Sequence, residues 1–217
     1  DIFSKEVAHT ESKGKRLLYG VVDEEGDITY YCMSSKNPTG GAPHSSAKQA
    51  AKGILVGERT FVIEKSHIEY LNRKGFYGKM MGDALQLSLI ECCFLIEKGD
   101  LKVTTGAGEN ITAKKALKLG VKAQEEFELR LATYRDLRKR GLVVKTGFKY
   151  GTHFRVYEGS PDRGHAKYLV HSVSNDKILM WPEISRTVRL SGGVKKEVLF
   201  CRAEDPMEYL EFRWFRP

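Results

Sequence analysis

The C-terminal half of the chain alternates short strand-like runs with turn residues, and this pattern limits the fold more than any other feature. The runs are rich in β-branched and aromatic residues and occur at 142–145, 154–157, 167–173, 177–180, 198–202 and 209–214. A helix is expected over 122–140, where Gly141 ends it, and a shorter helix over 182–190. Strands that follow one helix and enclose another predict an α/β sheet domain.

In the N-terminal half the sequence predicts a hairpin, a loop and a few short helices and strands. Residues 15–33 have the pattern of a β-hairpin, and the Gly, Ser, Pro and Lys-rich stretch 34–53 that follows is typical of a loop. An extended run at 54–65, a helix or turn near 67–72 and a helix over 82–98 come next. The fold class is therefore expected to be α/β (α+β). Its parts are a hairpin with a loop at 1–53, a small helix-and-strand subdomain at 54–121, and a C-terminal mixed-sheet domain with flanking helices at 122–217.

The hairpin also repeats a pattern found near the C-terminus. Residues 15–31 align with residues 196–212: each has a lysine, an apolar strand, an acidic turn and a second aromatic strand. We interpret the hairpin as the tail of an earlier, otherwise missing copy of the C-terminal domain.

The 217 residues carry a formal net charge of +8, and the excess lies mainly in the C-terminal part. Residues 122–217 hold 19 Lys and Arg against 13 Asp and Glu, whereas residues 1–121 hold 17 against 15. Such a surface attracts phosphate backbones, although a solvated basic surface is an equally ordinary interpretation. Lys36, Lys48 and Lys52 of the loop are candidates for phosphate contacts, with a plain connector as the favoured alternative.

The cysteine spacing, the lack of long apolar runs and the first residue bear on the cellular compartment and the processing of the protein. The four cysteines form no CxxC pair, which favours reduced, buried thiols over a structural zinc site. The sequence contains no run of about 18 apolar residues, which a membrane-spanning helix would need. A cytoplasmic protein without a membrane partner is therefore expected. A chain that begins with Asp1 is expected to be a processed product or a piece of a longer protein.

Tyr157, His165 and Lys196 are the candidates for chemistry. A phenol next to a positive group can accept a proton, an imidazole can donate one at neutral pH, and an ammonium can stabilise a pentacoordinate phosphate. RNA supplies its own 2′-hydroxyl nucleophile, so such a site needs no metal and no cofactor. Taken singly, the three residues are more typical of a packed aromatic, a solvated turn histidine and a surface lysine than of catalytic groups.

A metal site is the competing interpretation, because His153, His165, His171 and Asp162 lie close together in the sequence. If His165 and His171 share one strand, they are roughly 20 Å apart. That separation is too large for one ion.

The segments around these residues resemble the archaeal tRNA-splicing endonucleases. They read Gly-Leu-Val-Val-Lys-Thr-Gly-Phe-Lys-Tyr-Gly at 141–151, Phe-Arg-Val-Tyr at 154–157, His-Ala-Lys-Tyr-Leu-Val at 165–170, Val-Arg-Leu at 188–190 and Val-Lys-Lys at 194–196. The resemblance implies that Tyr157 is the general base, His165 the general acid and Lys196 the charge stabiliser. It also implies that Arg189 and Trp214 clamp a bulged RNA base.

The resemblance further implies a substrate and an assembly. The family cuts a bulge-helix-bulge in precursor tRNA twice, which requires two active sites, so a second copy or a structural partner chain is expected. Acidic loops of one unit dock near the catalytic domain of another. The residues that match these loops are Asp23, Glu24, Glu25, Asp27, Glu204 and Asp205. A non-catalytic RNA-binding or scaffolding subunit of such a complex is the alternative function.

Overall fold

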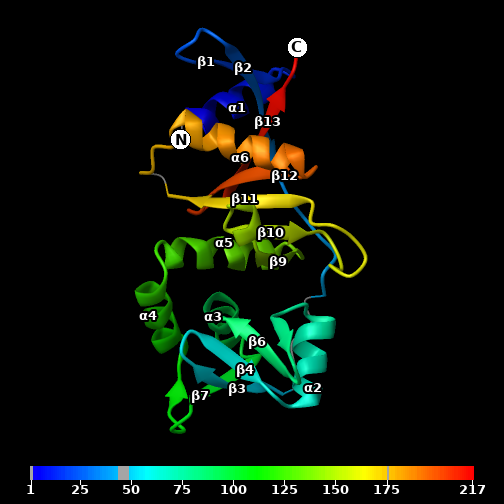
Figure 1. Ribbon diagram of the computed structural model, residues 1–217, viewed down its shortest axis with the longest axis vertical. Helices are drawn as coiled ribbons and strands as arrows, with labels where there is room; N and C mark the ends of the chain where they lie inside the picture. The colour runs from blue at the N-terminus through cyan, green and yellow to red at the C-terminus, as the bar shows by residue number, and fades with distance from the viewer. Residues whose placement is uncertain (1, 44–48, 175) are drawn as a thin grey trace. The chain divides into compact units, whose positions relative to one another are not determined.

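The computed structural model describes residues 2–43, 49–174 and 176–217, which separate into two compact units (Figure 1). Unit 1 combines Asp1–Gly40 with Asp136–Pro217, and unit 2 is Gly41–Arg135. Lys48, one of the loop lysines considered above, lies outside the described residues. The division of the chain at residues 53 and 121 stays a prediction.

Unit 1 is built on a mixed sheet. Its strands are β1 (Leu17–Val22), β2 (Ile28–Lys36), β9 (Val143–Thr146), β10 (Phe154–Tyr157), β11 (Tyr168–Val173), β12 (Glu197–Arg202) and β13 (Glu208–Phe215). Within the described residues these form one seven-stranded sheet in the order β1-β2-β13-β12-β11-β10-β9. Strands β11 and β12 run parallel and the other neighbours antiparallel. The sheet and its helices confirm the predicted α+β class.

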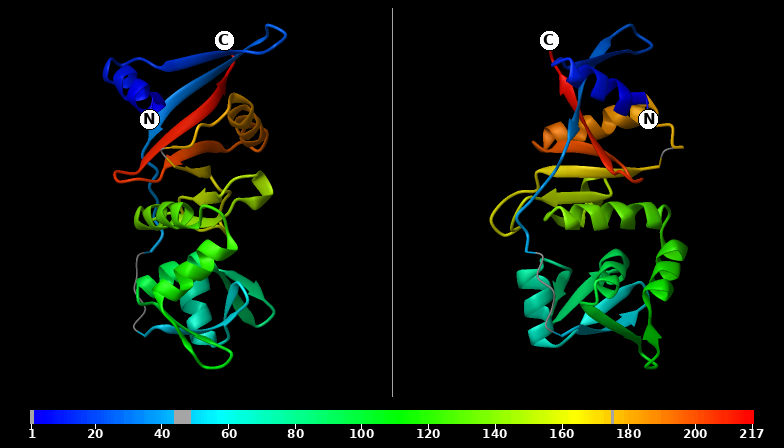
Figure 2. Two further views of the ribbon diagram at one scale, coloured as in Figure 1. Left: turned by 90° about the vertical axis from the view of Figure 1, so that its left-hand side faces the viewer. Right: turned by 180° about the vertical axis from the view of Figure 1, so that it is seen from behind.

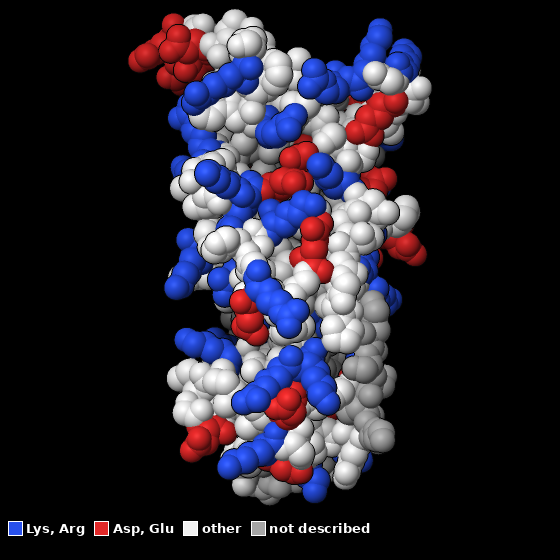
Figure 3. All heavy atoms as spheres, turned by 90° about the vertical axis from the view of Figure 1, so that its right-hand side faces the viewer, with Lys and Arg blue, Asp and Glu red and all other residues white. Residues whose placement is uncertain are grey.

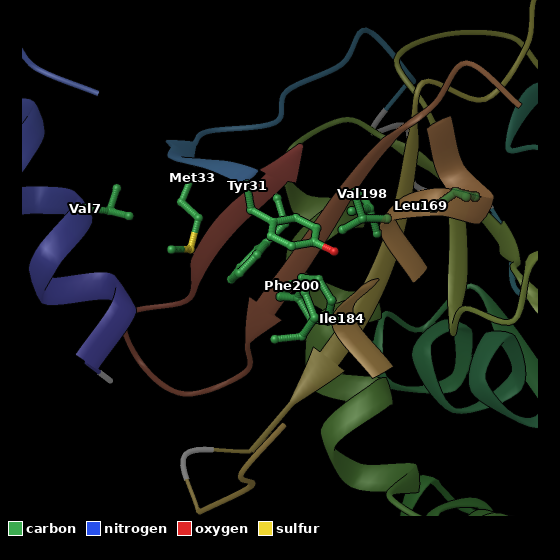
Figure 4. Packing of buried hydrophobic residues seen from close by; sticks show 9 residues of the cluster. Val7, Tyr31, Met33, Leu169, Ile184, Val198 and Phe200 are labelled. Carbon is green, nitrogen blue, oxygen red and sulfur yellow. The ribbon is translucent and has the colours of Figure 1, made fainter. Parts of the chain in front are cut away.

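Helices α1 (Ile2–Ser12) and α6 (Trp181–Gly193) pack on the same face of this sheet. Val7 of α1 and Ile184 of α6 enter one buried cluster with side chains from the central strands (Figure 4). Met33 of β2 and Phe212 of β13 belong to that cluster, with 1% and 4% of their surfaces exposed. The N-terminal segment is therefore part of the core of unit 1.

The pairing of β2 with β13 agrees with the sequence repeat. If Lys15 is equivalent to Lys196, then Cys32 is equivalent to Arg213, and these two residues are Cα partners across the two strands. Each strand thus pairs antiparallel with its own equivalent, as two copies related by a two-fold axis would. Figure 2 shows the blue strand β2 beside the red strand β13. That the hairpin is the tail of an earlier copy stays a prediction.

Unit 2 carries the second sheet. Its elements are β3 (Ala51–Val56), β4 (Arg59–Val62), α2 (Lys65–Ile68), the π-helical turn η1 (Glu69–Lys74), β5 (Lys79–Met81), β6 (Ala84–Ser88), α3 (Leu89–Glu97), β7 (Leu101–Thr105), β8 (Asn110–Ile111) and α4 (Ala113–Ala123). The strands follow the order β5-β6-β4-β3-β7-β8 within the described residues, with β3 and β7 parallel. Helix α5 (Phe127–Lys139) crosses the boundary between the units.

The helix predicted over 82–98 is wrong in its first half, because residues 84–88 form strand β6. Leu85 and Leu87 are fully buried and alternate with half-buried neighbours, which is the period of a strand. Ser88 then caps α3: its hydroxyl accepts from the Glu91 amide at 3.3 Å, and Glu91 accepts from the Ser88 amide at 3.0 Å. This capping box starts the helix seven residues later than predicted.

The helix predicted over 122–140 begins too early. Helix α4 ends where the Gln124 backbone becomes extended, and Glu126 has a positive φ of 54° that no helix accommodates. Helix α5 starts only after this break, and Gly141, with φ 74°, ends it as predicted. Residues 177–180 form no strand: Ile178 is 85% exposed, and Met180 is the N-cap of α6.

The four cysteines are buried thiols, as predicted from their spacing. Burial raises the pKa of Cys93 to about 12, so this thiol is protonated at neutral pH. Among the described helices, none is both long enough and apolar enough to cross a membrane.

If β2 is a core strand of unit 1, Met33→Ala should lower the free energy of unfolding by about 2–5 kcal/mol, the usual cost of a buried large-to-small change. Leu18→Ala is the control, since Leu18 lies on β1 of the same hairpin and is 43% exposed. Urea denaturation of both variants measures the difference. Equal midpoints for Met33→Ala and Leu18→Ala would mean that the hairpin is a loose appendage.

Candidate active site

The register of three strands brings Tyr157, His165 and Lys196 to one edge of the sheet. Val156 is the Cα partner of Tyr168, and Tyr168 is the partner of Glu197. Tyr157 therefore ends β10 at the edge where β11 and β12 begin, and His165 and Lys196 lie just before those two strands. Strand β10 runs antiparallel to β11, whereas β11 and β12 run parallel to each other. The end of β10 therefore lies beside the starts of β11 and β12.

Backbone and side-chain hydrogen bonds hold this edge together. The Lys167 amide donates to the Val156 carbonyl at 2.9 Å, and the Glu197 amide donates to the Lys167 carbonyl at 3.0 Å. The Lys196 ammonium donates to the Ala166 carbonyl at 3.0 Å, which places the ammonium against the residue that follows His165. The ring of Tyr150 lies 5.9 Å from the same ammonium. Lys196 is thus directed towards the loop between β10 and β11.

Tyr157 and His165 differ in their surroundings. Tyr157 is 9% exposed, and the guanidinium carbon of Arg155 lies 5.9 Å from the centre of its ring. His165 is exposed, in the loop that leads into β11. The Tyr157 side chain is thus largely shielded, whereas the His165 imidazole is open to solvent.

A cavity of about 800 Å³ lies in unit 1 beside this edge. Lys196, Arg189 and Trp214 all line it, so three of the five predicted chemical and RNA-binding residues share one hollow. Tyr157 and His165 are not among its lining residues. Other cationic side chains in the lining are those of Lys167, Lys195, Arg213 and Arg216. The cavity is therefore suited to an anion.

Arg189 and Trp214 are neighbours, as the predicted clamp requires. The Arg189 guanidinium carbon lies 5.7 Å from the centre of the Trp214 ring system, and that of Arg216 lies 4.4 Å from it. Arg189 comes from α6 and Trp214 from the end of β13. Arg216 was missed from the sequence; it lies two residues after Trp214, just past the end of β13.

Lys167 is a second residue that sequence reasoning missed. Its ammonium donates to Glu158 at 2.7 Å, and the Tyr168 hydroxyl donates to the same carboxylate oxygen at 3.0 Å. The hydrogen bond from Lys167 lowers the pKa of Glu158, and the reciprocal bond raises the pKa of Lys167. Burial raises the pKa of Tyr168. Lys167 is therefore a fixed positive charge between His165 and the start of β11.

The two acidic turns lie at opposite ends of the sheet. Strand β12 leaves the edge that holds Lys196, so the turn with Glu204 and Asp205 is at the far end, whereas β2 begins at the same edge as Lys196. Both turns are exposed. Asp23 also shapes its own turn, since it accepts from the amides of Glu25 and Asp27 at 3.0 and 2.9 Å. Docking by Glu24, Glu25 and the other acidic residues stays a prediction.

The surface is basic over wide areas. On the face drawn in Figure 3, Lys and Arg side chains are spread broadly, with smaller groups of Asp and Glu side chains between them and one acidic group at the upper left corner. Within the part of the chain that the structure describes, no group of three or more His, Cys, Asp or Glu side chains is placed to hold a metal ion.

Two stretches of the chain match family models. Residues 51–117 match the tRNA intron endonuclease N-terminal domain, and residues 127–209 match the tRNA intron endonuclease catalytic C-terminal domain. The second match contains Tyr157, His165 and Lys196.

Similar proteins are known from archaea. The tRNA-splicing endonuclease of Methanococcoides burtonii is 34% identical over 95% of this chain and 61% of its own length. That of Halobacterium salinarum is 37% identical over 91% and 57%. That of Methanothermobacter thermautotrophicus is 39% identical over 75% of this chain and 96% of its own length. The chain thus spans about 60% of the first two relatives and nearly all of the third.

Proposed function

Because this chain belongs to the tRNA intron endonuclease family, we propose that it cuts precursor tRNA at bulge-helix-bulge sites. The observation that carries the proposal is the shared sheet edge of Tyr157, His165 and Lys196, with a cationic cavity beside it. The relatives named as tRNA-splicing endonucleases support the same substrate class.

The proposed reaction is a transesterification within the RNA. Tyr157 removes the proton of the 2′-hydroxyl, the O2′–P bond forms, the P–O5′ bond breaks, and His165 gives its proton to the leaving 5′-oxygen. The products are a 2′,3′-cyclic phosphate and a 5′-hydroxyl. All atoms come from the RNA and the two side chains, so the reaction proceeds without a metal or cofactor.

Lys196 has an electrostatic part in this reaction. The phosphorus gains negative charge as the 2′-oxygen attacks, and an ammonium held in advance stabilises that charge without reorganisation. The bond from Lys196 to the Ala166 carbonyl, at 3.0 Å, supports such a fixed position. This bond also leaves two of the three ammonium hydrogens for phosphate oxygens.

The cavity gives the RNA a place for an unpaired base. Single-stranded bases are recognised by stacking on aromatic rings and guanidinium planes, and Arg189 lies over Trp214 in this way. A base that enters between them replaces the contact seen here. A base within a helix has its stacking faces covered by its neighbours and cannot enter this space. Arg189 and Trp214 would therefore favour bulged over helical RNA.

Two cuts in one substrate need two sites. The proposed working form therefore contains a second copy of the chain or a structural partner chain, with the acidic turns at Asp23–Asp27 and Glu204–Asp205 as docking elements. A non-catalytic scaffolding subunit is the alternative, which the presence of all three chemical groups at one edge disfavours.

His165→Ala should slow single-turnover cleavage of a bulge-helix-bulge RNA by about 10²–10⁴-fold, because a general acid contributes this much. The measurement is made in EDTA, with His9→Ala, which changes an exposed histidine of α1, as the matched control. Equal rates for the two variants would remove His165 from the mechanism. RNA binding without any cleavage by the unaltered chain would favour the scaffolding alternative.

Arg189→Gln should weaken binding of bulged RNA by roughly 5- to 150-fold, the range that corresponds to one lost base stack of about 1–3 kcal/mol. Arg186→Gln is the matched control, since Arg186 is exposed on the same helix one turn earlier. Affinities are measured for bulged RNA and for a fully paired duplex. The clamp assignment is wrong if Arg189→Gln lowers the affinities for bulged RNA and for the duplex equally, or if it lowers neither affinity.

A further inference from the structure

The described lining of the cavity contains two acidic residues, Glu197 and Glu211, among six cationic ones. Two carboxylates next to Lys196 oppose the binding of RNA phosphates. Their charge has to be balanced if the cavity is to attract a polyanion.

Both carboxylates bind the same lysine. The Lys36 ammonium lies 3.0 Å from the nearer oxygen of Glu211 and 3.3 Å from that of Glu197. Ser34 also donates to Glu211, at 3.2 Å. The Glu211 side chain is only 9% exposed, so its negative charge has little water to screen it.

The sheet register explains how one residue reaches both partners. Lys36 pairs with Tyr209 on β13, and Leu199 of β12 pairs with Glu211. Side chains two residues apart on a strand share a face, so Lys36, Glu211 and Glu197 form a diagonal across β2, β13 and β12. This face is opposite the one that carries α6, because Phe212 and Val198 point into the core there. Glu197 and Glu211 of this triad line the cavity, whereas Lys36 is not among the lining residues.

Lys36 keeps its charge in this position. Burial lowers the pKa of Lys36, but the hydrogen bond and charge of Glu211, together with those of Glu197, outweigh burial and raise the pKa above its ordinary value. The cation is thus present at every pH at which the RNA would be bound.

We propose that Lys36 is a positioning residue of the RNA site, which acts by offsetting one of the two negative charges that Glu197 and Glu211 bring to the cavity lining and by holding the strand that follows Lys196. The inference rests on the proposed function. It gives the N-terminal hairpin a direct part in that function, because strand β2 supplies the cation. Removal of the Lys36 charge changes the net charge of the triad from −1 to −2.

The test measures binding of a bulge-helix-bulge RNA that carries 2′-deoxy residues at the cleavage positions, and single-turnover cleavage of the unmodified RNA. Lys36→Met should weaken binding about tenfold or more, as one uncompensated charge beside a phosphate site predicts. Lys36→Arg should bind like the unaltered chain. Lys13→Met removes the same net charge from an exposed position and serves as the matched control.

A double variant separates charge from structure. Lys36→Met with Glu211→Gln restores the net charge of the triad but not its ion pairs, so it should recover most of the lost affinity. The inference is overturned if the double variant stays as weak as Lys36→Met, or if Lys36→Met binds like Lys13→Met. Urea midpoints identify any variant that is simply unfolded.

The outcomes also distinguish this inference from the proposed function. An unaltered chain that neither binds nor cuts the RNA refutes both. An unaltered chain that binds and cuts, with Lys36→Met unchanged, refutes only the part assigned to Lys36.

Discussion

The parallel pairing of β11 with β12 is the constraint on which the candidate site depends. Because Tyr168 and Glu197 are partners, the residues just before both strands meet at one edge, and β10 ends there as well. A change of one residue in this register would turn Lys196 to the other face of the sheet. The buried cores on both faces oppose such a slip, so the packing of unit 1 also fixes the geometry of the site.

The pairing of β2 with β13 extends the same sheet on its other side. It brings Met33 into the core and the Lys36 ammonium to the two carboxylates of the cavity lining, so one strand contributes both to packing and to charge balance. The strand pairs with its own sequence equivalent about Cys32 and Arg213, which links the arrangement to the internal repeat.

Much of this could be predicted from local sequence, and the rest depended on long-range pairing. Tyr157, His165 and Lys196 were proposed from motifs and stay a prediction as catalytic residues, whereas most strands of unit 1 were predicted from their β-branched residues. Residues 84–88 were misjudged because the spacing of Leu85 and Leu89 fits a helix, while the burial of Leu87 in a sheet does not show in sequence. Helix α1 was missed because its apolar side is narrow, with Val7 as its buried residue. Lys36 was considered as a phosphate contact, since nothing local reveals that it pairs with Glu197 and Glu211.

The central claim is that this edge of the sheet cleaves RNA through its own 2′-hydroxyl. The most direct test is mass analysis of the ends formed when a bulge-helix-bulge RNA is cut in EDTA, beside an RNA with 2′-deoxyribose at the cleavage position. The account predicts 2′,3′-cyclic phosphate and 5′-hydroxyl ends, and no cut in the deoxy substrate. Ends with 3′-hydroxyl and 5′-phosphate, or cleavage of the deoxy substrate, would contradict it.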